Sequence, residues 1–267
     1  MSSEIFQLHR GNTPLIVSFP HVGTQIPEEL RPAYVERALW LEDTDWHLES
    51  LYDFVGELGA TLISPFLSRY VIDLNRPPQD APLYDGTNST ELCPTRFFTG
   101  EPLYRAGCAP SQDEVEYRRR QFWQPYHDAL DQELGRLQAT HGHALLLDAH
   151  SIRSQLPWLF DGKLPDLNLG TANGHSCAAT LRDALTQVLA NGSRYSHVVD
   201  GRFRGGYITR HYGRPETGIH AVQLEMCWSC YMGEVPPYEL DESRAVYLRP
   251  LLREFAATML YWASQNG

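Results

Sequence analysis

The sequence predicts an α/β protein with three layers, in which helices cover both faces of a mixed, largely parallel sheet. Short apolar runs of strand length alternate along the chain with longer segments of helical periodicity. No linker-like shift in composition divides the 267 residues, and α/β chains of this length often form one domain around one large core. We therefore expect residues 1–267 to form a single domain.

The first quarter of the chain is expected to open as β-α-β-β. Residues 15–19 form a short apolar run, β-branched in part and stopped by a proline, which is typical of a buried strand. Residues 43–58 carry apolar side chains at helical spacing and end before a glycine, which predicts a helix. Two further strands are predicted at 61–64 and 70–74.

The middle of the chain predicts a long loop followed by a long helix. Residues 75–110 are rich in Pro, Gly, Asn and Thr and are too many for a simple connection, so we expect a functional loop. Residues 111–140 favour a helix that begins with a capping box formed by Ser111 and Glu114. Pro125 predicts a kink or a break in this helix.

The second half of the chain alternates between predicted strands and helices. We expect strands at 144–147, 198–200 and 221–226, and helices at 173–189 and 241–262. In sheets of this kind, ligands bind beyond the carboxyl ends of the strands. Polar residues at those ends are therefore the candidates for a functional site.

Charge and composition exclude several classes of partner. The formal net charge is −11 and Lys is scarce, so a nucleic-acid partner is not expected, because such binders need a concentrated basic face. The five cysteines follow no disulfide framework, the first ten residues show no secretory signal, and no stretch reaches the ~18 apolar residues of a membrane span. We expect a cytoplasmic protein without a membrane partner, and the sequence leaves its oligomeric state open.

Two histidines and a glutamate stand at the ends of predicted strands and would converge on one crevice. His21 follows the first strand, His150 follows the central one, and Glu225 lies on a late one. A catalytic zinc takes about three nitrogen or oxygen ligands and keeps one position open. The two imidazoles supply two ligands, and either Asp45 or His47 could supply the third.

A second candidate group consists of Arg69 and the pair Asn75 and Arg76. An acidic protein that binds an acidic substrate must gather positive charge locally, through arginines or a metal ion. An Asn-Arg pair can grip a carboxylate, the Arg in a bidentate manner and the Asn through its amide. Arg69 could then polarise a carbonyl that is about to be cleaved.

The stretch 204–213 combines paired glycines with Tyr207 and Arg210, which predicts a flexible lid or a substrate-binding loop; a plain surface loop is the alternative. Cys227 and Cys230 form a CxxC motif without a second one at zinc-ribbon spacing. We therefore interpret both as cysteines of the core.

The same residues also allow structural interpretations. Each histidine could be a satisfied core or loop residue. Asp148 could orient His150 from behind or cap the next turn. Arg76 could form a structural bridge with Asp73 or Asp80.

Five blocks of the sequence resemble the N-formylglutamate amidohydrolase (deformylase) family. The blocks are SFPHVG (18–23), DTDWH (43–47), SRYVIDLNRP (68–77), DAHS (148–151) and GGYITR (205–210). Together with Glu225 they extend over nearly the whole chain. The resemblance implies a single catalytic domain with a zinc-carboxypeptidase-like fold. It also implies hydrolysis of N-formyl-L-glutamate to formate and L-glutamate, the last step of one bacterial route of histidine breakdown.

The resemblance also implies roles for individual residues. The run 73–76 is similar to one in aspartoacylase and succinylglutamate desuccinylase, where the Asn-Arg pair holds a substrate carboxylate and an upstream arginine assists the carbonyl. By this resemblance Asn75 and Arg76 form the clamp, Arg69 polarises the carbonyl, and Glu225 is the general base.

The metal implied is Zn²⁺ or another divalent transition metal, with His21 and His150 as ligands. Those distant relatives place a glutamate three residues after the first histidine, where this chain has Thr24. The third ligand must come from elsewhere, with Asp45 as the first choice and His47 as the second.

N-formylglutamate carries two carboxylates, so one clamp is not enough. Arg210 is expected to bind the second carboxylate, and Tyr207 belongs to the same substrate-binding stretch. Two alternatives stay open. One is another zinc acyl-amino-acid amidase or a carboxypeptidase, and the other is a non-catalytic module that binds a small dicarboxylate.

Overall fold

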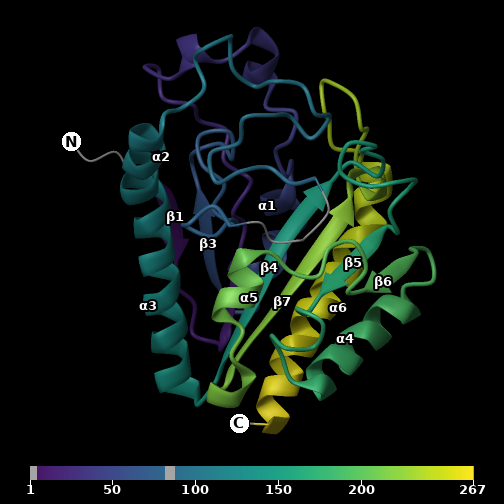
Figure 1. Ribbon diagram of the computed structural model, residues 1–267. Helices are drawn as coiled ribbons and strands as arrows, with labels where there is room; N and C mark the ends of the chain where they lie inside the picture. The colour runs from purple at the N-terminus through teal and green to yellow at the C-terminus, as the bar shows by residue number, and fades with distance from the viewer. Residues whose placement is uncertain (1–4, 82–87, 267) are drawn as a thin grey trace.

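The structure is a computed structural model that describes residues 5–81 and 88–266. Within these ranges seven strands form one sheet in the order β1-β3-β2-β4-β7-β5-β6 (Figure 1). The strands are β1 Phe6–His9, β2 Leu15–Ser18, β3 Thr61–Pro65, β4 Ala144–Ile152, β5 Leu167–Gly170, β6 His197–Val199 and β7 Ile219–Cys227. The pairs β2·β3, β2·β4, β4·β7 and β5·β6 are parallel, whereas β1·β3 and β5·β7 are antiparallel. The expected mixed, largely parallel sheet is confirmed.

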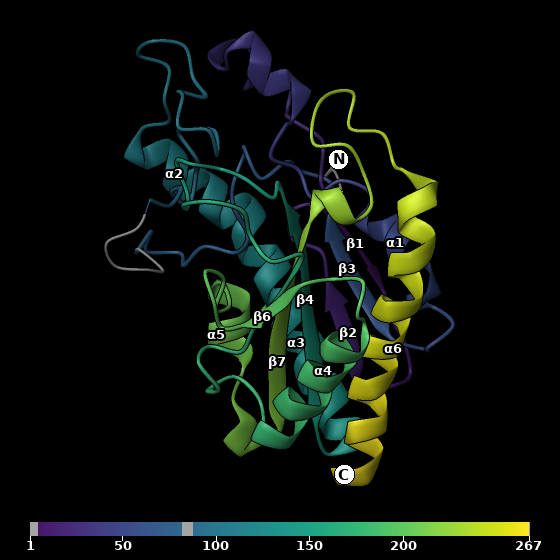
Figure 2. The same cartoon turned by 90° about the vertical axis from the view of Figure 1, so that its right-hand side faces the viewer.

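Helices cover both faces of this sheet. The α-helices of the described ranges are α1 Leu48–Leu51, α2 Gln112–Arg118, α3 Gln124–His141, α4 Ala179–Asn191, α5 Tyr207–Tyr212 and α6 Glu242–Asn266. Figure 2 shows α5 on one side of the sheet and α6 on the other. None of these helices combines the length and the apolar character that crossing a bilayer requires.

Alternate residues of the central strands face two separate cores. Val17 of β2 belongs to the cluster that contains Phe255 of α6, whereas its neighbour Ile16 packs with Leu130 of α3. All nine residues of β4 are buried, which explains why its sequence begins as a continuous apolar run without alternation. The three-layer arrangement predicted from the sequence is confirmed.

The helix predicted over residues 43–58 is wrong for most of its length. Only α1 and a 3-10 turn at Asp53–Val55 are helical. His47 has a φ of 64°, in the left-handed region, and an α-helix cannot continue through such a residue. The preceding residues 43–46 therefore form a turn that carries Asp45 into the interior.

The strand predicted over residues 70–74 is also wrong. This segment is an irregular buried loop, in which the Asp73 backbone N–H donates to Leu92 O and the Val71 N–H to Ser68 O. The polar side chain of Asp73 is fully buried and makes interactions of its own, described below. The apolar run reflects burial of a loop rather than pairing in the sheet.

Other predicted elements hold, with shifted ends. The strand predictions at 15–19, 61–64, 144–147, 198–200 and 221–226 correspond to β2, β3, β4, β6 and β7. Ser111 caps α2 by accepting from the Glu114 N–H at 3.3 Å. The predicted break near Pro125 is a π-helical turn at Arg119–Trp123, after which α3 starts with the proline in its first turn.

Three elements were absent from the prediction. β1 and β5 are short, and α5 lies in the stretch 204–213 that was expected to be a loop. Of the predicted loop 75–110, residues 82–87 lie outside the described ranges.

Candidate active site

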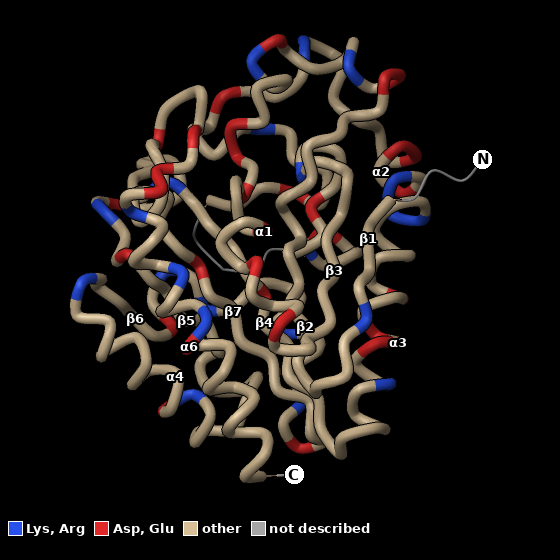
Figure 3. The backbone as a smooth tube through the Cα atoms, turned by 180° about the vertical axis from the view of Figure 1, so that it is seen from behind, with Lys and Arg blue, Asp and Glu red and all other residues tan. Residues whose placement is uncertain are grey.

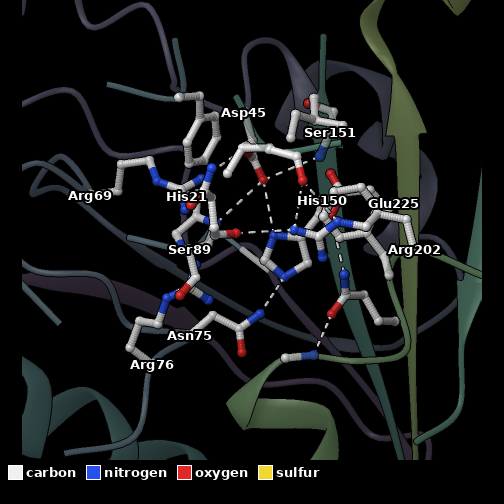
Figure 4. Close-up of a pocket in the computed structure, with 17 residues that line it drawn as sticks. His21, Asp45, Arg69, Asn75, Arg76, Ser89, His150, Ser151, Arg202 and Glu225 are labelled. Carbon is white, nitrogen blue, oxygen red and sulfur yellow. Dashed lines mark hydrogen bonds and ion pairs between the residues drawn. The ribbon is translucent and has the colours of Figure 1, made fainter. Parts of the chain in front are cut away.

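A pocket opens at the carboxyl ends of the central strands, where the chemistry-bearing residues converge (Figure 4). His21 follows β2, whereas His150 and Glu225 lie within β4 and β7 and are direct partners in the register of these strands. Asp45 enters from the turn before α1. Three of the four come from neighbouring parallel strands, as the strand-end argument predicted.

His21, Asp45 and His150 form a compact buried group. One potential ligand atom from each lies within 4.8 Å of the other two. The Nδ1 atom of His150 is 3.0 Å from Oδ2 of Asp45, and Nδ1 of His21 is 3.7 Å from the same oxygen. Two imidazole nitrogens therefore face one carboxylate, which is a donor set typical of divalent transition metals.

A second carboxylate holds each histidine from behind. Nε2 of His21 donates to Oδ1 of Asp73 at 2.7 Å, and Nε2 of His150 lies 3.0 Å from Oδ2 of Asp148. Such outer carboxylates fix the orientation of metal-binding imidazoles, and here they leave both Nδ1 atoms directed at Asp45. The predicted orienting role of Asp148 matches this geometry.

A buried nitrogen atom without a hydrogen-bond partner also indicates that these three residues can bind a metal ion. Nδ1 of His21 is buried and has no hydrogen-bond partner among the residues that the structure describes. Burying a polar nitrogen without a partner is costly, and a cation bound between the two Nδ1 atoms and Asp45 would satisfy it.

The carboxylates of this group are held in their ionised form. Burial alone would raise the pKa of Asp45, but His150 and His21 outweigh it and the pKa is lowered. Burial also acts against ionisation of Asp73, yet His21 and Arg69 hold its pKa well below the usual value. Both carboxylates are thus anionic and suited to a cation-binding site.

His47, the second choice for the third ligand, lies outside this group. Its Nε2 atom donates to the backbone carbonyl of Tyr238 at 2.6 Å, and its ring lies against Trp46. The structure thus brings Asp45, and not His47, to the two histidines.

Arg69 is buried beside the candidate ligands. Its Nη2 donates to Asp73 Oδ2 at 2.7 Å, its Nη1 is 3.7 Å from Asp45 Oδ1, and its guanidinium lies over the Phe98 ring at 4.4 Å. These contacts hold the Arg69 guanidinium in the pocket, as its predicted role of polarising a substrate carbonyl requires.

Asn75 and Arg76 both line the pocket, but their contacts differ. The Asn75 amide is used within the protein, since Nδ2 lies 2.9 Å from Asp148 Oδ2 and 2.8 Å from His150 Nε2, and Oδ1 accepts from the Ile208 N–H. Arg76 is half-buried and donates from Nε to the carbonyl of Thr90. The structural bridge to Asp73, which was the alternative interpretation of Arg76, has a distance of 4.0 Å between Arg76 Nε and Asp73 Oδ2, at the limit of an ion pair.

Glu225 is buried at the pocket wall. Its Oε2 accepts from Nε2 of Gln223 at 3.1 Å, and Oε1 of Gln223 in turn accepts from the Gly206 N–H at 2.7 Å. Burial raises the pKa of Glu225 to about 8. A raised pKa makes the carboxylate a stronger base toward water than an exposed glutamate, which suits proton transfer near neutral pH.

Tyr207 and Arg210 do not line the pocket. The Tyr207 ring packs against His127 and His211, and Arg210 is exposed with its Nε donating to the carbonyl of Gly205. In this stretch it is Gly206 that reaches the pocket.

The sequence interpretation gave no role to two pocket residues, Arg202 and Gln223, and it did not pair Asp73 with His21. Arg202 stands three residues before the Gly-Gly pair and Gln223 two before Glu225, on the same face of β7. Strand alternation could therefore have identified Gln223. The partnership of Asp73 with His21 joins residues far apart in the chain, and no local pattern signals it.

Comparison with known proteins shows a close similarity over almost the full chain. A model of the family described as N-formylglutamate amidohydrolase matches residues 13–232. The N-formylglutamate deformylases of Pseudomonas putida and Pseudomonas aeruginosa are each 48% identical over 263 residues, covering 98% of this chain and 98% of each relative. The crystal structure of an N-formylglutamate amidohydrolase from Ralstonia eutropha JMP134 is similar with a TM-score of 0.75 at 25% identity, covering 98% of this chain and 97% of that one.

Proposed function

This chain belongs to the N-formylglutamate amidohydrolase family, and from that premise we propose that it hydrolyses N-formyl-L-glutamate and water to formate and L-glutamate. The observation that carries the proposal is the convergence of His21, Asp45 and His150 beside Glu225 in a pocket that arginines line. This set offers a metal site, a proton carrier and positive charge for a dianionic substrate.

We propose that His21, Asp45 and His150 hold Zn²⁺ or another divalent transition metal. Such an ion, when bound, supplies Lewis-acid activation of water and of the formyl carbonyl. Asp73 and Asp148 keep the two imidazoles directed toward Asp45, so that the site is prepared for the ion before it binds.

Glu225 is the proposed general base and then the general acid. It takes a proton from the attacking water and delivers that proton to the departing amine of glutamate. Burial raises the pKa of Glu225 and the neighbouring His150 lowers it, and the net raised pKa favours proton transfer near neutral pH. Arg69 is the proposed donor to the formyl oxygen, which gains negative charge as the carbon becomes tetrahedral.

Arg76 and Asn75 are proposed to receive the α-carboxylate. Arg76 supplies the positive charge at the pocket. Asn75 lies directly beside it, and its amide contacts with His150 and Asp148 tie the carboxylate subsite to the candidate metal group.

The biological setting follows as a further part of the proposal. The reaction would serve as the last step of one bacterial route of histidine breakdown, in the cytoplasm and with a small dicarboxylate as the partner. The five cysteines are all unpaired thiols, which agrees with a reducing compartment.

A panel of acylated amino acids tests the proposed function. We expect formate release from N-formyl-L-glutamate, and kcat/KM lower by about 10- to 200-fold for N-acetyl-L-glutamate, because one added methyl group must fit a site shaped for hydrogen. A preference for N-succinyl substrates or for peptides would instead identify another amidase or a carboxypeptidase. Binding of glutamate without turnover of any acyl compound would indicate a binding module.

A further inference from the structure

We propose that the ring of Phe98 limits the acyl group of the substrate to formyl, an inference that rests on the proposed deformylase function. The carbonyl carbon of an N-formyl amino acid bears an oxygen, the scissile nitrogen and a hydrogen. In an acetyl or a succinyl amino acid, a carbon chain replaces that hydrogen. Selection for formyl therefore needs a rigid group at the place to which the hydrogen points.

The Phe98 ring lies beside the proposed donor to the formyl oxygen. Its centre is 4.4 Å from the guanidinium carbon of Arg69, so the ring covers one face of that cation. A guanidinium donates in its own plane, and a carbonyl oxygen that accepts from Arg69 therefore brings its carbon close to the edge of the ring. The scissile nitrogen must be directed toward Glu225, which protonates it, and this leaves the third substituent on the side of Phe98.

Other apolar residues of the pocket belong to a different part of it. The large apolar side chains in the described lining are Phe98, Ile152, Leu159 and Phe203. The Leu159 carbonyl accepts from Arg202 at 3.2 Å, and the Phe203 ring centre is 5.3 Å from the guanidinium carbon of Arg202. Figure 4 shows Arg69 and Arg202 on opposite sides of the two histidines. Leu159 and Phe203 are therefore grouped around Arg202, whereas Phe98 lies at Arg69, where the acyl carbon is proposed to bind.

The surroundings of Phe98 hold its ring in place. Only 7% of the residue is exposed, and its side chain belongs to the core cluster that contains Phe255 of α6. The Phe98 backbone N–H donates to Oδ2 of the buried Asp43 at 3.0 Å, and the same oxygen accepts from the Tyr70 hydroxyl at 2.9 Å. An added methyl group thus meets a ring that cannot give way without disturbing a packed core and these hydrogen bonds.

The variants Phe98→Leu and Phe98→Ala test this assignment with N-formyl-L-glutamate and N-acetyl-L-glutamate. The quantity measured is the ratio of kcat/KM for the formyl substrate to kcat/KM for the acetyl substrate. We expect Phe98→Ala to lower this ratio by about 10-fold or more, because the variant has room for the methyl group, and Phe98→Leu to lower it less. Loss of the ring also removes support from Arg69, so the rates with both substrates should fall, but the ratio is independent of a loss that both share.

Phe97→Leu is the matched control, because Phe97 is the neighbouring buried phenylalanine and also lies under an arginine, with Arg37 4.3 Å from its ring centre. It packs in another cluster and is not part of the described pocket lining, so this variant should keep the wild-type ratio. Thermal unfolding identifies variants that have lost the fold. An unchanged ratio in folded Phe98→Ala, or a lowered ratio in Ile152→Ala with Phe98→Ala unaffected, would overturn the assignment.

Two outcomes separate this inference from the proposed function. A wild-type protein that releases formate but hydrolyses the acetyl substrate equally well would overturn the role of Phe98 and leave the function standing. A wild-type protein that releases no formate would refute the function, but calorimetric binding of N-acetyl-L-glutamate still tests the ring. We expect Phe98→Ala to bind this compound about 10-fold more tightly than the wild type does. Equal binding by both proteins would overturn the assignment.

Discussion

Asp45 lies between two buried histidines, and its backbone N–H donates to the carbonyl of His21 at 3.0 Å. This contact ties the turn before α1 to the end of β2. Because the carboxylate faces both Nδ1 atoms, it completes the proposed site of three ligands without a contribution from His47. Measurements of metal binding can therefore decide whether Asp45 or His47 is the third ligand.

At the residue scale, Asp45→Asn and His47→Ala should behave differently. Asn cannot supply an anionic ligand, so we expect zinc affinity to fall by more than about 100-fold in Asp45→Asn, with loss of formate release. His47→Ala is the matched control and should keep its zinc. Elemental analysis after dialysis measures both, and loss of zinc from His47→Ala alone would reverse the assignment.

Glu225→Gln separates proton transfer from metal binding. The amide has nearly the same shape as the carboxylate but cannot take a proton, so kcat should fall by about 10²- to 10⁴-fold. Zinc content should remain that of the wild type, because Glu225 is not one of the three proposed ligands. Near-normal turnover by this variant would remove Glu225 from the mechanism.

At the scale of elements, α5 and β7 are joined to the site through Gly206. Its N–H donates to Gln223, and a Cβ atom at this position would lie 2.4 Å from Nδ2 of Asn75. The amide of Asn75 in turn contacts His150. The residue directly before helix α5 must therefore be one that has no side chain.

The variant Gly206→Ala should displace Asn75 and weaken the site. The backbone angles at Gly206 are open to alanine, so the cost is steric, and we expect a destabilisation of about 1–3 kcal/mol with reduced formate release. Gly135→Ala, in α3 with open space around it, is the control and should stabilise the fold by about 0.5–1 kcal/mol. Urea unfolding compares the two, and equal stability of Gly206→Ala and the wild type would contradict the packing argument.

Elements were predictable where local periodicity and burial agree. The strands β2, β4 and β7 are apolar runs buried on both faces, and the cap at Ser111 is a local motif. Residues 43–58 and 70–74 have the same local patterns, but interactions of Asp45 and Asp73 with distant histidines determine their backbone instead. A pattern of apolar residues does not reveal which polar side chain is turned inward.

At the scale of the whole molecule, the acidic net charge coexists with a pocket that three arginines line. Figure 3 shows basic residues interspersed with acidic ones along the chain. The positive charge relevant to a dianionic substrate is therefore local to the pocket, as the composition alone suggested.

The way the whole chain folds determines which residues of the site could be predicted from the sequence. His21, His150 and Glu225 could be found because parallel strands deliver their ends to one edge of the sheet. Arg69 and Arg76 could be found because a resemblance covers that block. Arg202 could not, because its place in the pocket depends on how the loop after β6 folds back toward Leu159 and Asn88.

The central claim is that a divalent metal held by His21, Asp45 and His150 is required for hydrolysis of N-formyl-L-glutamate. The most direct test measures formate release by the purified protein before chelation, after chelation and after zinc is restored, with metal content determined at each stage. We predict that activity disappears with the metal and returns with zinc. Full activity in protein that elemental analysis shows to be free of metal would contradict the account.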